Sequence, residues 1–219
     1  MFDWRWDFVW EILPLLLRAT VNTLLAAGMG YAIAVVLGLI FALAQRTPSK
    51  GFNRTVREIV EFIRSTPLVL QIFFVFFVGP QFGVRLSPWT SGMIAIGLHY
   101  AAYLSEVYRG GIDSVPKGQW EAAKALSLSP TRTYARIIIP QALPPSIAGM
   151  GNYLVGIFKD TPMLSVIRVA ELLRTASAIG SNHYRYLEPY TMVGIIFLSI
   201  SLPAAALVRA FEAWTRYKL

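Results

Sequence analysis

The sequence predicts an all-α integral membrane protein with five transmembrane helices. Hydrophobic residues make up 55% of the 219 residues and charged residues only 15%, whereas soluble domains carry about 25% charged residues. A helix needs about 20 apolar residues to cross the hydrocarbon core of a bilayer. Five continuous stretches of that length or more contain no Asp, Glu, Lys or Arg: residues 19–45, 65–84, 86–105, 137–158 and 189–208. Their continuous apolar character predicts helices rather than barrel strands, which alternate apolar and polar residues.

Lysine and arginine are unevenly distributed between the segments that connect these stretches. Segments 46–64, 106–136 and 209–219 hold 5, 5 and 3 of them, and the other 7 lie at the N-terminus, at Arg85 and in segment 159–188. Five spans place these two groups on opposite sides of the membrane. The positive-inside rule then puts the N-terminus outside and the C-terminus in the cytoplasm. The net charge of +8 therefore reflects membrane topology, and we expect no binding of nucleic acid.

The N-terminal segment 1–18 is predicted to be an interfacial helix that leads into the first span. It carries Trp4, Trp6 and Trp10, and tryptophan favours the headgroup level of a membrane. It lacks the features of a cleavable signal peptide, so we expect the first span to act as its own insertion signal. Within that span, small residues recur every four positions and predict close helix packing: Ala26, Gly30, Ala34, Gly38 and Ala42.

Segment 46–64 is predicted to be an amphipathic cytoplasmic helix that runs into the second span. Thr66 and Pro67 follow it, and because proline removes an intrahelical hydrogen bond, we expect the helix to bend or restart there. Gln71 lies one turn deeper as an isolated amide. We expect it to bond either another helix or a polar solute.

The third span carries polar side chains on one helical face. His99, Tyr103 and Glu106 are spaced i, i+4, i+7 and therefore share that face. Glu106 is predicted to pair with Arg109, three residues further on, near the inner surface. His99 and Tyr103 lie deeper and are candidates for a solute pocket, although a hydrogen bond between helices would explain either of them.

A turn-rich polar passage separates the third and fourth spans. Residues 121–128 favour a short helix, and Ser129 followed by Pro130 is a typical start for a second one. The entry to the fourth span is then predicted to be interrupted by three prolines, which are Pro140, Pro144 and Pro145.

The fourth span contains the amide Asn152 and ends at Lys159 and Asp160, which we expect to neutralise one another at the outer edge. Residues 160–190 predict two weaker helical pieces that are too short or too charged to cross a membrane. The fifth span is predicted to be broken by Pro203.

Several catalytic patterns are absent. The sequence has no GxxxxGK[ST], GxGxxG, HExxH or GxSxG, and no cysteine. Neither of its two histidines has another within metal-ligand spacing. We therefore predict no catalytic residues, no metal site and no cofactor of its own, and a protein that is not an enzyme.

Residues 121–140, EAAKALSLSPTRTYARIIIP, resemble the cytoplasmic loop motif of ATP-binding cassette (ABC) importer permeases. That motif has EAA, a glycine six residues after the glutamate, and I-x-L-P. Ser127 stands at the glycine position and Ile139 at the leucine position, so we expect altered turn geometry at Ser127. The matching residues are Glu121, Ala122, Ala123, Ile137 and Pro140.

The flanking segments RSTPLVLQ, VPKGQWEAAKALSLS and IIIPQALPPSIAGMGNYLVGIFKDT resemble polar amino-acid importer permeases, and the likeness covers nearly the whole chain. It looks close to the ectoine and hydroxyectoine branch. The resemblance implies one transmembrane permease domain over residues 1–219 with a type I ABC importer permease-like fold. Segment 106–140 would then be its cytoplasmic coupling loop.

The resemblance also implies partners. A second permease chain, identical or different, would pair with this one in the lipid of a bacterial plasma (inner) membrane. A cytoplasmic ATPase dimer, which binds ATP and magnesium, would dock on the short helices, with Glu121 at a helix N-terminus and Ala122 and Ala123 leaving room for close contact. An extracytoplasmic binding protein would deliver a small polar zwitterionic solute, an amino acid or an ectoine-like compound.

Two alternatives stay open from the sequence. One is a stand-alone proton-coupled secondary transporter that uses Glu106 or His99 as its proton site, and the other is a membrane-embedded enzyme. For any solute path, the polar side chains within spans are the candidates: Gln71, His99, Tyr103 and Asn152.

Overall fold

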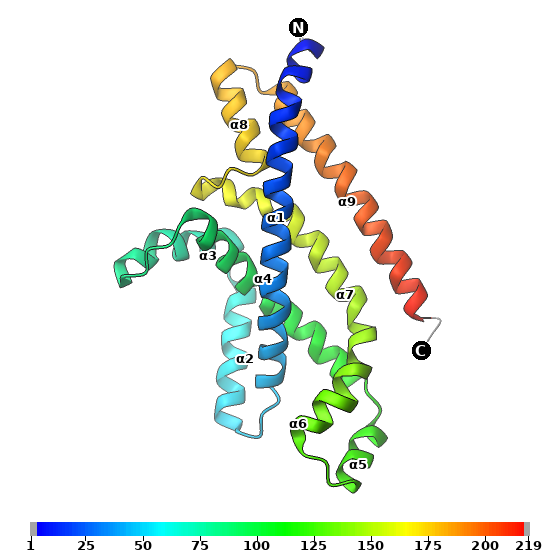
Figure 1. Ribbon diagram of the computed structural model, residues 1–219. Helices are drawn as coiled ribbons and strands as arrows, with labels where there is room; N and C mark the ends of the chain where they lie inside the picture. The colour runs from blue at the N-terminus through cyan, green and yellow to red at the C-terminus, as the bar shows by residue number, and fades with distance from the viewer. Residues whose placement is uncertain (1–3, 217–219) are drawn as a thin grey trace.

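The computed structural model describes residues 4–216, and these residues are helical throughout with short connections (Figure 1). Two short elements are π-helical (η1 and η3) and two are 3-10 helices (η2 and η4). In chain order the elements are α1 (Trp6–Ala44), α2 (Lys50–Ser65), α3 (Leu68–Phe73), η1 (Phe74–Val78), η2 (Gly79–Phe82), α4 (Pro88–Asp113), α5 (Lys117–Ala125), α6 (Pro130–Thr133), η3 (Tyr134–Ile138), α7 (Ile139–Asp160), η4 (Thr161–Ile167), α8 (Leu172–His183) and α9 (Leu187–Arg216).

Among the described residues, two helices are long and apolar enough to cross a membrane, Trp6–Ala44 and Leu187–Ala213. The bent pair Lys50–Ser65 and Leu68–Phe82 makes a third if it is counted as one span. The predicted count of five therefore stays a prediction. The predicted third and fourth spans form α4 and α7. These two helices contain glycines, prolines and charged residues among their apolar residues. Their most apolar stretches therefore have a lower mean hydropathy than those of α1 and α9.

Helix α1 is one continuous helix of 39 residues with Pro14 inside it. At about 1.5 Å per residue it is longer than a bilayer core of about 30 Å. The predicted N-terminal helix 1–18 is therefore not a separate element, because from Trp6 onward it forms the first turns of α1; residues 1–3 lie outside the described part.

The predicted stripe of small residues is confirmed as the contact between α1 and α4. All five of its members are buried. A Cβ atom on Gly30 would lie 2.7 Å from Ile96 Cγ2, and one on Gly38 would lie 2.9 Å from Leu104 Cβ. Larger side chains would push the two helices apart, so the stripe sets how closely α4 approaches α1.

The predicted bend at Thr66 and Pro67 is confirmed. Helix α2 ends at Ser65, α3 begins at Leu68, and the two parts meet at 104°. The Gln71 amide nitrogen donates to the Ile63 carbonyl at 2.7 Å and to the Thr66 carbonyl at 3.1 Å. The Ile63 carbonyl also accepts from the Thr66 N–H at 3.3 Å, so the Gln71 amide adds a second bond there and ties α3 to the end of α2 across the bend.

Ser129 caps α6 as expected, with its hydroxyl accepting from the Arg132 N–H at 3.5 Å.

The prolines, in contrast, do not interrupt the helices as the sequence predicts. Pro144 and Pro145 lie inside α7, and Pro203 lies inside α9. The irregularity instead falls on the π-helical turn η3, directly before Pro140 at the start of α7. A wider turn at this point relieves the clash of a proline ring with the preceding turn.

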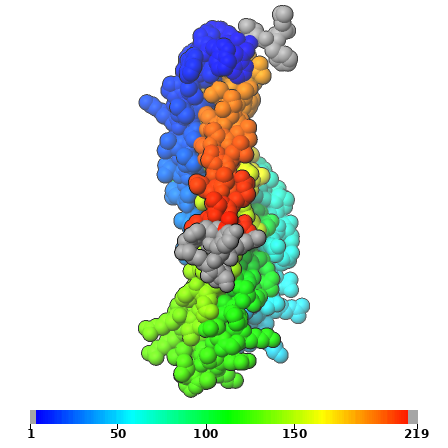
Figure 2. All heavy atoms as spheres, turned by 90° about the vertical axis from the view of Figure 1, so that its right-hand side faces the viewer, coloured from blue at the N-terminus to red at the C-terminus, as the bar shows by residue number. Residues whose placement is uncertain are grey.

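The molecule is elongated, with α1 at its centre and the α5–α6 segment at the end opposite the start of α1 (Figure 1). Seen from the side, the green surface that includes α5 and α6 forms that end, and α9 runs along the facing surface (Figure 2). The main apolar core joins α1, α4 and α7. The α5–α6 segment is therefore connected in the chain to this core through α4 on one side and through η3 and α7 on the other.

Candidate functional site

Helix α5 presents one exposed face at the end of the molecule. Glu121 and Ala122 are exposed, and Leu126 directly after the helix is 70% exposed. Ala123, in contrast, is only 2% exposed, so its methyl group packs inside this chain and does not widen a docking surface. Glu121 is also not at the helix N-terminus as predicted, because α5 already begins at Lys117, next to the capping residue Pro116.

The turn after α5 explains why the loop motif has a glycine at the position of Ser127. Ser127 has φ of 50°, in the left-handed region. Its N–H donates to the Lys124 carbonyl at 2.9 Å, and the Leu128 N–H donates to the Ala123 carbonyl at 3.0 Å. This is a Schellman helix end, whose left-handed residue is usually glycine because glycine has no Cβ. Serine at this position carries a strain of about 1 kcal/mol.

Helix α5 is held against the body by its other face. The rings of Trp120 and Tyr134 meet edge to face, with their centroids 5.4 Å apart. The Gln141 amide donates to the Gln119 side-chain oxygen at 3.3 Å. Both contacts join α5 to the helical run that leads into α7, so α5 and α7 are mechanically linked.

A cluster of aromatic and polar side chains lies between α4 and α7. The His99 and Tyr103 rings lie 5.2 Å apart, and Tyr153 lies 5.6 Å from Tyr103. The Tyr100 hydroxyl donates to Asp160 Oδ2 at 2.7 Å. Nδ1 of His99 is buried without a hydrogen-bond partner. We call these five residues the aromatic cluster.

Of the four predicted solute-path residues, the structure brings together His99 and Tyr103. Gln71 serves the bend between α2 and α3, and Asn152 is exposed, one position from the inward-facing Tyr153. The sequence reasoning missed Tyr100 and Tyr153. Hydroxyls on aromatic rings within two predicted spans were the signal that would have indicated them.

The two predicted ion pairs have different outcomes. Arg109 is paired with Glu106 as expected. Lys159 and Asp160, however, form no ion pair within the described residues, since Asp160 accepts from Tyr100 and Lys159 is exposed. Adjacent residues on a helix point about 100° apart, which disfavours contact between their side chains.

The Tyr103 hydroxyl extends the aromatic cluster toward α2. It donates to the Arg64 carbonyl at 3.2 Å, and the Arg64 guanidinium lies 5.4 Å from the centre of the Tyr103 ring. Among residues 4–216, no group of three or more His, Asp or Glu side chains is arranged to hold a metal ion. The chemistry that these groups offer is therefore hydrogen bonding and cation–π contact with a polar molecule.

Comparisons with known proteins agree over most of the chain. Residues 34–217 match the family described as binding-protein-dependent transport system inner membrane component. The chain is 44% identical over 219 residues to the probable amino-acid ABC transporter permease protein y4tG of Sinorhizobium fredii (strain NBRC 101917 / NGR234), covering 97% of this chain and 95% of the relative. It is 33% identical over 213 residues to the glutamine transport system permease protein GlnP of Escherichia coli (strain K12), covering 96% of each.

The fold is also similar to a solved structure. A crystal structure of an amino acid ABC transporter with histidines superposes with a TM-score of 0.87 at 31% identity, covering 97% of this chain and 99% of that one. The similarity therefore extends along the chain from α1 to α9, beyond the short loop motif.

Proposed function

The chain belongs to the family of binding-protein-dependent transport system inner membrane components and is a permease subunit of an amino-acid ABC importer, and from this premise we propose how it works. It moves a small polar zwitterionic solute, an amino acid or an ectoine-like compound, inward across the bacterial plasma membrane. The ATPase of such an importer is a separate subunit, and the alternative of a stand-alone proton-coupled carrier is thereby superseded.

The observation that carries the proposal is the exposed face of α5. Glu121, Ala122 and Leu126 form a small surface at one end of the molecule, and the sequence has no nucleotide-binding pattern of its own. We propose that a cytoplasmic ATPase dimer docks on this surface. Docking then moves α5, and Trp120 and Gln119 transmit the movement to the start of α7.

The proposed topology has five spans, with the N-terminus outside and segment 106–140 in the cytoplasm as the coupling loop. The distribution of lysine and arginine supports it. Helix α1 is longer than a bilayer core, which supports the placement of its first part, residues 6–18, at or beyond the outer membrane surface. Partners of this arrangement are a second permease chain, identical or different, and an extracytoplasmic binding protein.

The aromatic cluster is the proposed contact for the solute within the membrane. Aromatic faces attract an ammonium group, and hydroxyl groups bond a carboxylate, so the cluster has partners for both ends of a zwitterion. Tyr100 and Asp160 already bond one another across α4 and α7. A solute that replaced this hydrogen bond would separate the two helices that flank the coupling segment.

The experiment reverses the charge of the α5 surface in the complete transporter. We expect Glu121→Lys to reduce solute-stimulated ATP hydrolysis and uptake at least tenfold, because a cation replaces a carboxylate in the docking surface. Glu11→Lys is the matched control, since Glu11 is an exposed glutamate on α1 at the opposite end. Equal activity of the two variants in proteoliposomes would sink the docking role of α5.

A further inference from the structure

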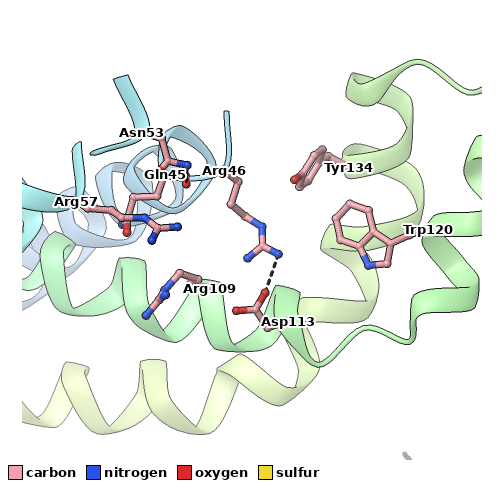
Figure 3. A pocket seen from close by; sticks show the side chains of 8 residues that line it. All are labelled: Gln45, Arg46, Asn53, Arg57, Arg109, Asp113, Trp120 and Tyr134. Atoms are coloured by element: carbon pink, nitrogen blue, oxygen red, sulfur yellow. Dashed lines mark hydrogen bonds and ion pairs between the residues drawn. The ribbon is translucent and has the colours of Figure 1, made fainter. Parts of the chain in front are cut away.

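A polar cleft lies between the cytoplasmic ends of the proposed spans and is distinct from the aromatic cluster and from the exposed face of α5. It has a volume of about 490 Å³. Its walls come from the end of α1, from α2, from the last turns of α4, from α5 and from η3 (Figure 3). The lining residues are Gln45, Arg46, Asn53, Arg57, Arg109, Asp113, Trp120 and Tyr134. We call it the arginine cleft.

The lining of the arginine cleft has more positive than negative charge. Arg46, Arg57 and Arg109 contribute guanidinium groups, and Asp113 contributes the single carboxylate. The three arginines line the cleft from the turn after α1, from α2 and from α4 (Figure 3). Like charges held close together repel one another, so an anion placed between them would lower the free energy of this arrangement.

The hydrogen-bonding capacity of these arginines is only partly used. Arg46 Nη2 donates to Asp113 Oδ1 at 2.6 Å, and Arg109 pairs with Glu106. Nε of Arg109 is buried and has no hydrogen-bond partner. Arg57 makes no hydrogen bond or ion pair within the part of the chain that the structure describes. Donors therefore remain for a further ligand.

Nearby carboxylates do not supply that ligand. An adjoining cleft of about 310 Å³ shares Arg57 and Arg109 with the arginine cleft. Its three glutamates are already paired: Glu61 pairs with Arg64 at 3.3 Å, Glu58 lies 3.9 Å from Arg54, and Glu106 pairs with Arg109. The excess of positive charge at Arg57 is thus not neutralised by the protein itself.

The position of the cleft favours a phosphate group as the ligand. Gln45 marks the end of the apolar run of α1, so the cleft lies at the proposed headgroup level. Helix α2 beside it is amphipathic and exposes Phe52, Ile59 and Phe62, as a helix lying against lipid does. Basic pockets between membrane helices on the cytoplasmic side are suited to anionic lipid headgroups.

We propose that the arginine cleft is a binding site for a phosphate-bearing anion, held by Arg57 and Arg109 with Arg46 alongside. Guanidinium groups match the geometry of phosphate oxygens and form charge-assisted hydrogen bonds with them. The bound phosphate joins α2, α4 and the end of α1. Because Trp120 and Tyr134 line the same cleft, occupancy also steadies the contact that holds α5 to the body.

The test uses the complete transporter in nanodiscs of phosphatidylcholine, with or without about one-third phosphatidylglycerol. Arg57→Gln removes an arginine of the cleft without breaking an ion pair to a described residue. Arg54→Gln is the control on the same helix outside the cleft, and it removes only an exposed 3.9 Å contact with Glu58. Native mass spectrometry measures the phosphatidylglycerol retained. A second arm, in detergent, measures the rise in unfolding temperature that inorganic phosphate produces.

We expect wild type and Arg54→Gln to bind the probe and Arg57→Gln to bind it about tenfold more weakly, the equivalent of about 1.4 kcal/mol. Retention of phosphatidylglycerol that phosphate does not displace identifies a lipid headgroup as the source. Stabilisation by phosphate without selective lipid retention identifies a free phosphate. The proposal is overturned if the wild type binds neither probe, or if both variants bind as the wild type does.

Discussion

The two ends of the molecule differ in how their polar groups are satisfied. At the N-terminal end, Glu171 is 0% exposed and accepts from the Leu173 N–H at 2.8 Å and the Arg174 N–H at 2.6 Å. Glu188 is 1% exposed and accepts from Arg185 Nε at 3.1 Å. At the α5 end, Leu126 is exposed, Ser127 has φ in the left-handed region, and Arg57 has no ion pair with any residue that the structure describes.

The contrast indicates where each end obtains its stability. The N-terminal end is closed by contacts within the chain: the Asn22 amide donates to the Ala170 carbonyl at 2.8 Å, and the Leu172 N–H donates to the Thr23 hydroxyl at 3.0 Å. The α5 end exposes the apolar side chain of Leu126, and Arg57 of the arginine cleft is not paired with any described residue. We infer that folding of this chain alone stabilises the N-terminal end, whereas the α5 end gains its stability when the transporter assembles.

Glu171→Ala has the largest expected effect and tests whether contacts within the chain stabilise the N-terminal end. It removes the cap of α8 and leaves two N–H groups in a buried site without an acceptor, which costs about 3 kcal/mol in the free energy of unfolding. Thermal unfolding of the purified transporter measures the loss. Glu11→Ala, at an exposed position on α1, is the control, and an equal effect of both variants would contradict internal closure of this end.

The pH dependence of stability gives a finer test of the same end. Burial raises the pKa of Glu171 from 4.5 to about 7, against the lowering effect of the Leu173 and Arg174 N–H groups. A raised pKa in an acid means that the folded state binds the proton more tightly than the unfolded state. The stability that protonated Glu171 contributes is therefore fully present below pH 4.5 and is lost as the pH rises through 7, on the order of 3 kcal/mol in all.

Glu171→Gln isolates this contribution, because the amide cannot titrate but can still accept a hydrogen bond. Unfolding temperatures measured between pH 5 and 8 should fall with rising pH in the wild type and stay nearly level in the variant. Parallel curves for the two proteins would assign the pH dependence to other groups.

Ser127→Gly produces the smallest expected effect and tests the α5 end. Glycine adopts φ of 50° without strain, so we expect a gain of about 1 kcal/mol in the stability of the helix end. Hydrogen exchange at the Leu128 N–H, which donates to the Ala123 carbonyl, reports it locally. Ser181→Gly, at an exposed site inside α8, is the control and should instead lower the stability of that helix. If Ser127→Gly does not slow exchange at the Leu128 N–H, Ser127 carries no strain.

The sequence by itself determined the features that depend on residues close together in the chain. These include the helical class, the bend after Ser65, the cap at Ser129 and the Glu106–Arg109 pair. Each depends on backbone hydrogen bonds or side-chain spacing within about one helical turn, and the residue types there allow few other outcomes.

The tertiary structure alone decided the features that join distant segments. Pairing of Tyr100 with Asp160, burial of Ala123 and the convergence of Arg46, Arg57 and Arg109 each depend on how α1, α2, α4 and α7 pack. Local patterns assign a residue to a helix face, but the partner of that face depends on the packing of the whole chain. Packing also carried α7 and α9 through their prolines, because contacts with neighbouring helices compensate for the hydrogen bonds that proline removes.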